Sequence, residues 1–370
     1  MTHSTDPLVS SIALALSRVP YSRVEDLGLS APDAISLPDE KWIRLGGYDN
    51  PSTAIAHRKA MMEKATEEAQ FIKAKKLSVL TPIDPGYPRR LLVAPVMPRM
   101  LTICGHADLD ADRMLSVVGT RMATPYGINF TERLIAELKE TVDPVTIVSG
   151  LAYGIDATAH RAALKNDMPT IAVVAHGLGM IYPASHRDLA SRIIKADGAI
   201  ISTYLHAEQP FRSHFLERNV LIASLSDATL VAESDIKGGA MSTAAHALDA
   251  GRDVLALPGR HTDKMSSGCN HLIRTRRAEL VTCAKEVIDT ICWKIPTNKK
   301  PPLQMAIFPA LSPIGEKIAA ALRERNEPVS LDELTITTGI PIHKLLSETA
   351  EMEFNGHLLR YPGGRIMLCV

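Results

Sequence analysis

Between Leu77 and Asp289, short apolar runs rich in β-branched residues alternate with amphipathic segments, and this alternation restricts the possible folds more than any other feature of the chain. Each short run is typical of a strand buried on both faces, and each segment between two runs has the period of a helix. Strands separated by single helices build a parallel sheet. The sequence therefore predicts an α/β fold with a doubly wound, mostly parallel, Rossmann-like sheet.

Six strands and five helices follow from this pattern. The expected strands are 115–118, 145–148, 170–174, 199–202, 228–232 and 253–256, and the expected helices between them are 126–140, 156–164, 187–195, 217–224 and 242–250. Ligands of doubly wound folds bind beyond the carboxyl ends of the strands. We therefore expect functional residues in the loops that lead from a strand into the next helix.

The rest of the chain predicts additional units, because 370 residues exceed the usual size of one domain. We expect a small helical domain of SAM-like or helix-hairpin-helix-like type over residues 1–76, the Rossmann-like domain over 77–290 and a linker rich in proline and lysine over 291–310. Residues 311–370 predict three helices and a terminal strand–turn–strand. Ser330 can cap one of these helices and Gly339 can end it. This order is typical of a winged-helix domain.

Composition restricts the function. The 41 lysines and arginines balance the 41 aspartates and glutamates, so any nucleic-acid contact must come from a local basic patch. The five cysteines contain no CxxC pair, which indicates neither a metal site nor a disulfide framework. The apolar run from Leu8 to Leu16 lacks the cationic leader of a signal peptide, and no stretch is long enough for a membrane span. We expect a cytoplasmic protein without membrane contact.

The first candidate loop consists of Gly119, Thr120 and Arg121, directly after the first expected strand. A glycine at this place lets backbone N–H groups approach an anion, and the N-terminus of the following helix adds favourable dipole charge. Arg121 supplies a fixed cation for phosphate. The alternative is a tight turn with a surface cation, and the loop lacks the GxGxxG spacing of a dinucleotide site.

The second candidate loop follows Ser149 and Gly150 and leads into the helix that contains Asp156 and His160. We expect Asp156 to cap this helix and to form an intrahelical hydrogen bond with His160, one turn later. A Ser–His–Asp hydrolase is the alternative, but Ser149 lacks the GxSxG motif of a nucleophile elbow. We therefore predict no catalytic residues and no enzyme activity.

The segment 210–219 concentrates two arginines, Arg212 and Arg218, with two phenylalanines in a chain that is only 4% aromatic. Rings beside cations suit a platform on which bases stack while phosphates are neutralised. The alternative is an ordinary helix start with Phe215 in the core.

A glycine pair, Gly238 and Gly239, followed by Ala240, opens the helix after the fifth expected strand. Alone it fits an ordinary turn. If the strands are assigned correctly, however, this loop lies with the others at one edge of one sheet, and their convergence favours a binding site.

Seven motifs now make the core recognisable. VVGTR (117–121), SGLAYGIDATAH (149–160), GLGMIYP (177–183), FLERN (215–219), GGAMSTA (238–244), LPGR (257–260) and GCNHLI (268–273) resemble the DprA/Smf family in the same order. An ordered series is more specific than any single motif. The resemblance implies a homodimeric protein that binds single-stranded DNA, protects it from nucleases and loads the recombinase RecA onto it in natural transformation, with no cofactor and no metal ion.

The resemblance also implies site residues. The arginine of the family's G-S/T-R loop is matched by Arg121, the cation three residues before the phenylalanine of F-x-x-R-N by Arg212, and that phenylalanine by Phe215. Arg218 and Asn219 complete the same motif. Backbone groups that would line the site belong to Gly119, Thr120, Ser149, Gly150, Gly239 and Ala240.

Several positions depart from the family's pattern. The run 238–240 replaces a frequent Ser-Gly-Ser and so lacks two hydroxyls, and Val220 replaces an arginine of R-N-R. Thr203 stands where an acid is usual. Arg212 stands where lysine is frequent, which keeps the charge and favours a bidentate grip. The segment 274–277 contains three arginines where many relatives have a Gly-Ala pair.

Three other functions stay open. A phosphoribohydrolase-like enzyme on a related Rossmann fold would need the glutamate of PGGxGTxxE, but Ala245 and His246 stand where this acid would fall. A protein that binds free nucleotides would use the same phosphate geometry. A transcriptional regulator would read duplex DNA through the winged helix, yet its expected recognition helix contains Glu348, Glu351 and Glu353, which phosphate repels. We expect this unit to make protein contacts or to support the dimer.

Overall fold

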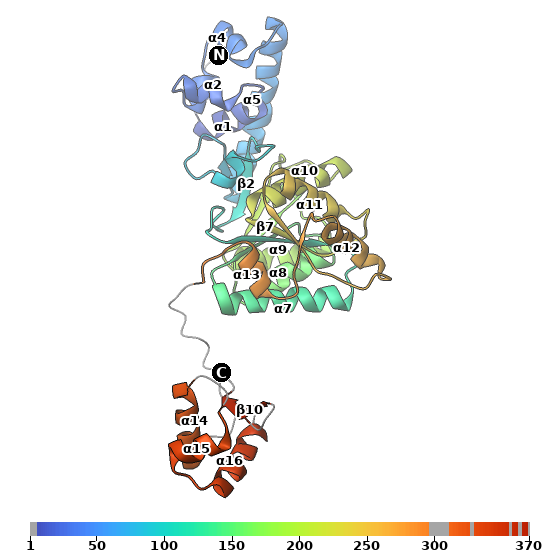
Figure 1. The fold of residues 1–370 in the computed structure, drawn as a ribbon. Coiled ribbons are helices and arrows are strands. Elements are labelled where there is room, and N and C mark those ends of the chain that lie inside the picture. Colours follow the sequence, from blue (N-terminus) through green and yellow to red (C-terminus); the bar gives the residue numbers. More distant parts are fainter. Residues whose placement is uncertain (1–5, 296–310, 326–328, 355–356, 362–364, 369–370) are drawn as a thin grey trace. The chain divides into compact units, whose positions relative to one another are not determined.

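The computed structural model of the chain describes residues 6–295, 311–325, 329–354, 357–361 and 365–368. The chain divides into a first unit, Met1–Ile295, and a second unit, Pro296–Val370 (Figure 1). Each is described separately. Among the described residues, no helix has both the length and the apolar character needed to cross a membrane.

One mixed sheet organises the first unit. Within residues 6–295 its order is β1-β2-β6-β5-β4-β3-β7-β8-β9. The strands are β1 Ser78–Leu80, β2 Leu101–Gly105, β3 Met114–Gly119, β4 Thr146–Ser149, β5 Thr170–Val173, β6 Ala199–Ser202, β7 Ala228–Glu233, β8 Asp253–Ala256 and β9 Glu279–Leu280. All neighbours from β6 to β9 pair in parallel, whereas β2 pairs antiparallel with both β1 and β6. The predicted doubly wound, mostly parallel sheet is confirmed.

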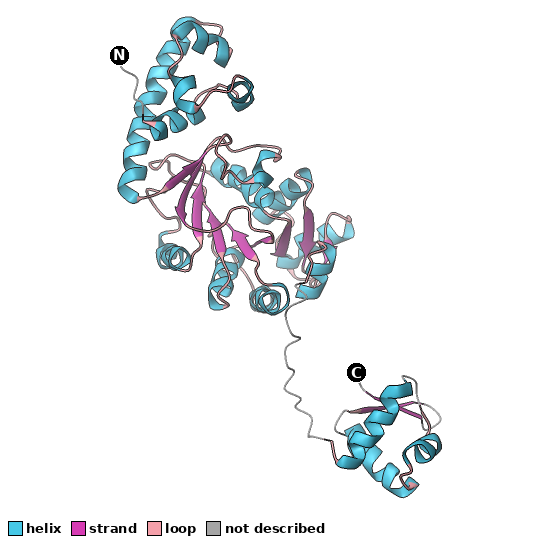
Figure 2. Ribbon diagram, turned by 90° about the vertical axis from the view of Figure 1, so that its left-hand side faces the viewer, coloured by secondary structure: helices cyan, strands magenta, loops and turns pink. Residues whose placement is uncertain are grey.

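Helices cover both faces of this sheet (Figures 1 and 2). On one face lie α7 Pro125–Val142, α8 Ile155–Lys165, α9 Arg187–Lys195 and α13 Ala284–Thr290, and on the other lie α10 Arg212–Leu225, α11 Gly239–Asp249 and α12 Ser267–Arg274. The adjacent strands β3 and β7 lead into helices on opposite faces, α7 and α11. Such a switch in winding direction leaves the loops at the carboxyl ends of the two strands free to hold a ligand.

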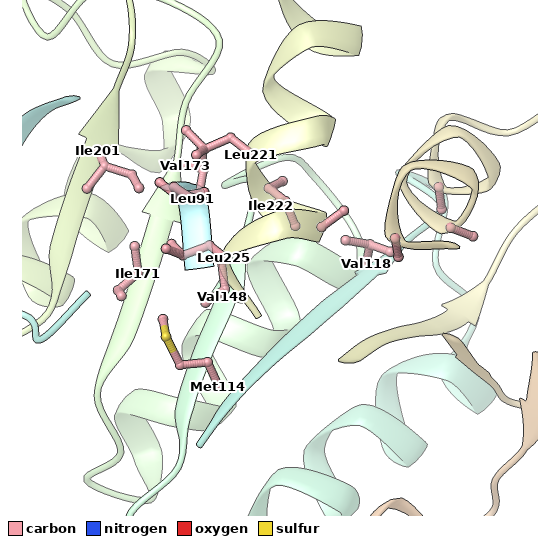
Figure 3. Packing of buried hydrophobic residues seen from close by; sticks show 14 of the residues in the cluster. Leu91, Met114, Val118, Val148, Ile171, Val173, Ile201, Leu221, Ile222 and Leu225 are labelled. Carbon is pink, nitrogen blue, oxygen red and sulfur yellow. The ribbon is translucent and has the colours of Figure 1, made fainter. Parts of the chain in front are cut away.

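The core beneath α10 shows why these residues form strands. Figure 3 shows Val118, Val148 and Ile171, from three adjacent strands, in the same buried cluster as Leu221 and Leu225 of α10. All five side chains are buried. Because successive side chains of a strand point to opposite faces, the neighbouring apolar residues fill the second core under α7 and α8. Continuous apolar runs are therefore required here.

The six predicted strands and the five predicted helices are all present, with three corrections. Strands β1, β2 and β9 were not expected. Helix α10 begins at Arg212, five residues before the expected start, so the Arg- and Phe-rich segment is helical. Helix α11 begins at Gly239, where the glycine pair was expected to form a turn. In both cases the residue before the helix, Phe211 or Gly238, is extended. The loop therefore ends, and the helix begins, several residues earlier than we expected.

The N-terminal part of the first unit is helical. Its helices are α1 Pro7–Leu16, α2 Tyr21–Asp26, α3 Ala31–Ile35, α4 Asp39–Gly46 and α5 Pro51–Lys75. Ser30 and Asp33 form a capping box that starts α3. Glu68 of α5 accepts hydrogen bonds from the backbone N–H of His206, and Phe71 stacks on the His206 ring, which joins these helices to the loop after β6.

The second unit contains α14 Pro313–Arg325, α15 Leu331–Thr338, α16 Ile342–Phe354, β10 Leu358–Tyr361 and β11 Arg365–Leu368, with β10 and β11 antiparallel. Ser330 caps α15 through a capping box with Glu333, and Gly339 ends it with a left-handed φ of 67°, as predicted. The turn between the two strands and most of the expected linker lie outside the described residues. Trp293 does not belong to an exposed linker, because its indole N–H donates to Asp227 at 3.2 Å and its ring packs on the core.

Candidate functional site

Three strand-to-helix loops meet at the carboxyl ends of the parallel strands. The backbone N–H of Thr120, after β3, donates to the carbonyl of Glu233 at the end of β7, at 2.7 Å. The N–H of Ile155, after β4, donates to the carbonyl of Thr120 at 3.3 Å. We use the name carboxyl edge for these loops (119–124, 150–154 and 234–238), the loop after β5 (174–186) and the first half of α10.

Glu233 fixes the loop that carries Arg121. Its buried carboxylate accepts from the backbone N–H and the hydroxyl of Thr124, at 2.8 and 2.5 Å, and lies against Gly127, where a Cβ would overlap it. A carboxylate at the start of α7 already satisfies the positive end of that helix. The prediction that the N-terminus of α7 adds attraction for a ligand anion is therefore wrong.

Phe215 lies close to two guanidinium groups. The Cζ atoms of Arg121 and Arg218 lie 5.2 and 5.9 Å from the centre of its ring. The ring of Tyr182 meets it edge-on, at 6.1 Å between centres and 62° between planes. Phe215 is half-buried, so the alternative that it belongs to the core is wrong. The arrangement leaves an aromatic ring and a cation together at an exposed surface.

Arg121 and Arg212 are exposed, and neither forms an ion pair with any residue of the described part of the chain. Arg212 begins α10 and lies one helical turn before Phe215, which places both residues on the same side of the helix. A solvated cation without a carboxylate partner is available to an anion.

Arg218 has a different environment, since it is buried. Its Nη1 donates to the carbonyls of Gly150 and Val173, at 2.6 and 2.8 Å, and so ties the ends of β4 and β5 to α10. A Cβ at position 150 would overlap this guanidinium, which explains the glycine. Burial lowers the pKa of Arg218 and raises the pKa of Asp156, and the opposite charge of each partner acts against both shifts. Arg218 is thus a buried neighbour of the Phe215 ring.

The remaining predicted residues lie at the same edge with different degrees of access. Ser149 is buried and its hydroxyl donates to the carbonyl of Val117 at 2.6 Å. The side-chain amide of Asn219 lies 3.5 Å from the carbonyl of Gly239, which joins α10 to the exposed start of α11. Ala240 is buried behind it. Gly119 and Thr120 are partly exposed beside Arg121.

Two predictions about the loop after β4 are wrong. Asp156 does not cap α8, which begins at Ile155 after the left-handed Gly154; the carboxylate instead accepts weakly from the N–H of Ala152, at 3.4 Å. His160 pairs with Thr170 at 2.7 Å and not with Asp156. With the Ser149 hydroxyl donating into the sheet, these side chains do not form the hydrogen-bonded series that a Ser–His–Asp nucleophile requires. Among the described residues, no group of three His, Cys, Asp or Glu side chains is placed to hold a metal ion.

Three residues of this edge were missed as site residues: Glu233, Tyr153 and Tyr182. The two tyrosines follow β4 and β5 in strand-to-helix loops, so their position was the signal that could have found them. Both are about half exposed, at 49% and 46%.

The fold and this edge define a class of protein: a doubly wound α/β protein with an exposed cation and ring at the switch point of its sheet. Comparison with known proteins gives the family. The model of the DNA recombination-mediator protein A family matches residues 78–292, and the model of the DprA winged helix domain matches residues 301–364. The chain therefore belongs to the DprA/Smf family.

Individual relatives agree. The chain is 36% identical over 244 residues to the DNA processing protein DprA of Streptococcus pneumoniae, covering 66% of this chain and 83% of that protein. It is similar to the crystal structure of DprA from that organism, with a TM-score of 0.65, 31% identity and 78% and 98% of the two chains covered. A structure of DNA processing protein A from Helicobacter pylori, which concerns its single-stranded DNA binding mode, matches with a TM-score of 0.52, 30% identity and coverage of 59% and 96%.

Proposed function

We propose that the chain binds single-stranded DNA at the carboxyl edge, with Arg121, Arg212 and Phe215 as its principal contacts. The observation that carries this proposal is the exposed, unpaired Arg121 guanidinium next to the Phe215 ring. Unstacked bases of a single strand present π faces to aromatic rings, and the backbone presents a phosphate for each nucleotide. The H. pylori relative, described as binding single-stranded DNA, supports the same ligand here.

Site residues divide into two groups under this proposal. Arg121 and Arg212 neutralise phosphates, and Phe215 stacks on a base. Arg218 and Asn219 hold α10 and α11 in place, while backbone groups of Gly119, Thr120, Ser149, Gly150, Gly239 and Ala240 shape the edge. The bound group is DNA held without chemical change, so we propose a binding protein with no cofactor.

Family membership supports a wider role. We propose that the chain protects incoming single strands and loads RecA onto them during transformation and recombination, as a cytoplasmic homodimer with the four-part organisation 1–76, 77–290, 291–310 and 311–370. The chain has no net charge that would attract DNA over its whole surface. A dimer would present two carboxyl edges to one DNA strand, and binding at the first edge would raise the effective concentration of the strand at the second.

The test compares binding of a single-stranded oligonucleotide to wild type and to the Arg121→Ala variant at several salt concentrations. Each phosphate neutralised by the protein steepens the salt dependence, so Arg121→Ala should weaken binding and lower the slope by about one unit. Phe215→Ala should weaken binding by about 1–3 kcal/mol with the slope unchanged. Melting curves of each variant verify the fold.

A protein that binds free nucleotides is the competing function. The same preparation should therefore be titrated with mononucleotides. Tight nucleotide binding without salt-dependent binding of single-stranded DNA would contradict the proposal.

We also propose that the second unit contacts protein and not duplex DNA. Helix α16 exposes Ile342 and Leu346, at 46% and 48%, and carries Glu351 and Glu353 nearby. An apolar and acidic face suits a protein partner and repels phosphate. Removing the exposed cation with Lys344→Ala should leave any duplex binding of the full chain unchanged; a clear loss would indicate duplex recognition by α16.

A further inference from the structure

We propose that Tyr182 and Tyr153 form a second base-stacking surface beside Phe215, so that a bound strand continues from Arg121 across the carboxyl ends of β5 and β4. This inference rests on the proposed binding of single-stranded DNA and extends it to a direction along the sheet edge. It assigns a role to two residues that the family motifs alone leave unexplained.

Tyr182 continues the surface that Phe215 begins. Its ring meets the Phe215 ring edge-on at 6.1 Å between centres, yet 46% of the residue is exposed. The position is fixed through the backbone, because the N–H of Tyr182 donates to Nε2 of the buried His176 at 3.1 Å. His176 in turn donates from Nδ1 to the carbonyl of Gly177 at 2.9 Å, and burial lowers its pKa, which keeps Nε2 free to accept. A ring held this way needs little ordering when a base arrives.

Tyr153 is held by two contacts. Its hydroxyl pairs with Ser185 at 2.8 Å, three residues after Tyr182, and its ring stands edge-on over His186 at 4.9 Å between centres. His186 is itself held, since its Nδ1 lies 2.8 Å from the carbonyl of Leu151. The hydroxyl of Tyr153 already has a partner, so what the residue offers to solvent is the face and rim of its ring, with 49% of the residue exposed.

The backbone places Tyr153 next to the loop of Arg121. The following residue, Gly154, has a left-handed φ of 73°, and a Cβ there would lie 2.8 Å from the carbonyl oxygen of Arg121. Tyr153 therefore lies between the Arg121 loop and the loop of Tyr182 and Ser185. Phe215 contacts the exposed Arg121, Tyr182 contacts Phe215, and Tyr153 lies on the loop next to that of Arg121. The three rings therefore lie on the β4 and β5 side of Arg121.

The chain has only 8 tyrosines and 6 phenylalanines, and two of the exposed tyrosines lie at this edge. Exposed apolar surface is unfavourable in water, and rigid rings that stay exposed suit a ligand that covers them. Bases of a single strand fit because stacking needs only a π face and no particular sequence. The rings carry no charge, so their contribution differs from that of Arg121 in its dependence on salt.

The experiment measures binding of oligothymidylates about 4 and about 20 nucleotides long to the full chain and its variants. Tyr182→Ala and Tyr153→Ala should each weaken binding of the long oligonucleotide by about tenfold, with an unchanged salt slope and a smaller effect on the short one. Tyr182→Phe, which keeps the ring, should bind as wild type does. The matched control is Tyr126→Ala: this tyrosine is 50% exposed, but its hydroxyl donates to Pro258 after β8, on the other side of Arg121, so binding should not change.

A fluorescence measurement keeps the test valid if an alanine variant does not fold. Tyr182→Trp introduces a reporter at the surface, while Trp42 is fully buried among the N-terminal helices and Trp293 lies at the amino end of β7 beside Asp227. Oligonucleotide binding should quench the new emission.

The outcomes separate the two proposals. If wild type binds and Arg121→Ala weakens binding, but the Tyr182 and Tyr153 variants bind as wild type does and the reporter is not quenched, the second stacking surface is wrong and the proposed function stands. If wild type itself does not bind single-stranded DNA, the proposed function fails first.

Discussion

Arginines lie at both ends of the parallel sheet, but the two ends differ in whether these arginines have carboxylate partners. At the amino end, Arg90 pairs with Asp227 at 2.7 Å and Arg89 pairs with Asp110 at 2.8 Å. At the carboxyl end, Arg121 faces the Phe215 ring, and within the described residues neither it nor Arg212 has a carboxylate partner. Arg89 and Arg90 at the amino end have carboxylate partners within the protein, whereas Arg121 and Arg212 at the carboxyl end are left for a ligand.

This difference explains how a chain without net charge can still attract an anion. The 41 cations and 41 acidic residues fix only the total charge, whereas the field that a ligand meets depends on which nearby cations lack an acidic partner. Total charge is thus a poor guide to nucleic-acid binding here. Replacing one arginine at a time tests whether the two ends really differ.

The largest effect is expected at Arg218, which is buried at the carboxyl edge. Arg218→Ala removes the donor to the carbonyls of Gly150 and Val173 and leaves the buried Asp156 without its compensating charge. Losing one partner of a buried charged group costs about 3–5 kcal/mol of folding free energy. Urea denaturation should show this loss.

The matched variant Arg218→Lys keeps the charge and loses the forked geometry, so it should recover part of the stability. If Arg218→Ala folds as stably as wild type and only weakens DNA binding, Arg218 is a ligand contact like Arg121, and the division of roles within this edge is wrong.

A second, smaller effect depends on pH. Burial lowers the pKa of His160 from 6.5 to about 3, so the unfolded chain takes up a proton at this residue at a pH where the folded chain does not. Folding stability should therefore fall as the pH falls from the unfolded pKa toward the folded one. For this group alone the loss between about pH 7 and about pH 5 is about 2 kcal/mol.

The measurement compares urea denaturation of wild type and His160→Gln across that range, so that contributions from other groups, such as Asp156 and His176, cancel. The slope of stability against pH should be shallower in the variant. Equal slopes would show that His160 is not kept neutral by burial.

Much of the fold was predictable because its signals are local. The six strands of the parallel core are short apolar runs, and the capping box at Ser330 and the left-handed Gly339 are read from neighbouring residues. Strands β1 and β9 are three and two residues long and too short to show a period. Strand β2 is recognised only by its pairing with β6, in which Ile103 lies opposite Ile201. Such a pairing has no local signal.

The sequence predicted which residues lie at the candidate site, but not what each of them does there. Arg121 and Phe215 were expected at one edge, and the structure brings them together. That Glu233 occupies the start of α7 could not be inferred, because its partner Thr124 is 109 residues away along the chain. The burial of Arg218 was equally hidden, since its acceptors are backbone carbonyls, which leave no trace in side-chain composition.

At the amino end, Arg90→Ala should lower stability without affecting DNA binding. Its guanidinium donates to Asp227 at 2.7 and 3.0 Å, and both side chains are mostly buried. Asp227 keeps two other donors, the N–H of Met114 and the indole of Trp293, so the loss should be only about 1.5–3 kcal/mol, the usual value of a hydrogen bond to a charged group. Oligonucleotide titration and urea denaturation of the same preparation measure both quantities. A loss of DNA affinity equal to that of Arg121→Ala would show that the amino end also takes part in binding.

The smallest effect is expected for Arg89→Ala, and this variant makes the comparison between the two ends sharpest. Arg89 and Arg121 are both exposed arginines, and each substitution removes one positive charge. Arg89 already has the Asp110 carboxylate at 2.8 Å, and exposed ion pairs contribute little to stability, so the melting temperature should not change measurably. The DNA affinity and the salt slope of Arg89→Ala should equal those of wild type, whereas Arg121→Ala should lower both. If the two variants lose affinity equally, binding depends on total charge, and the carboxyl edge has no special part in it.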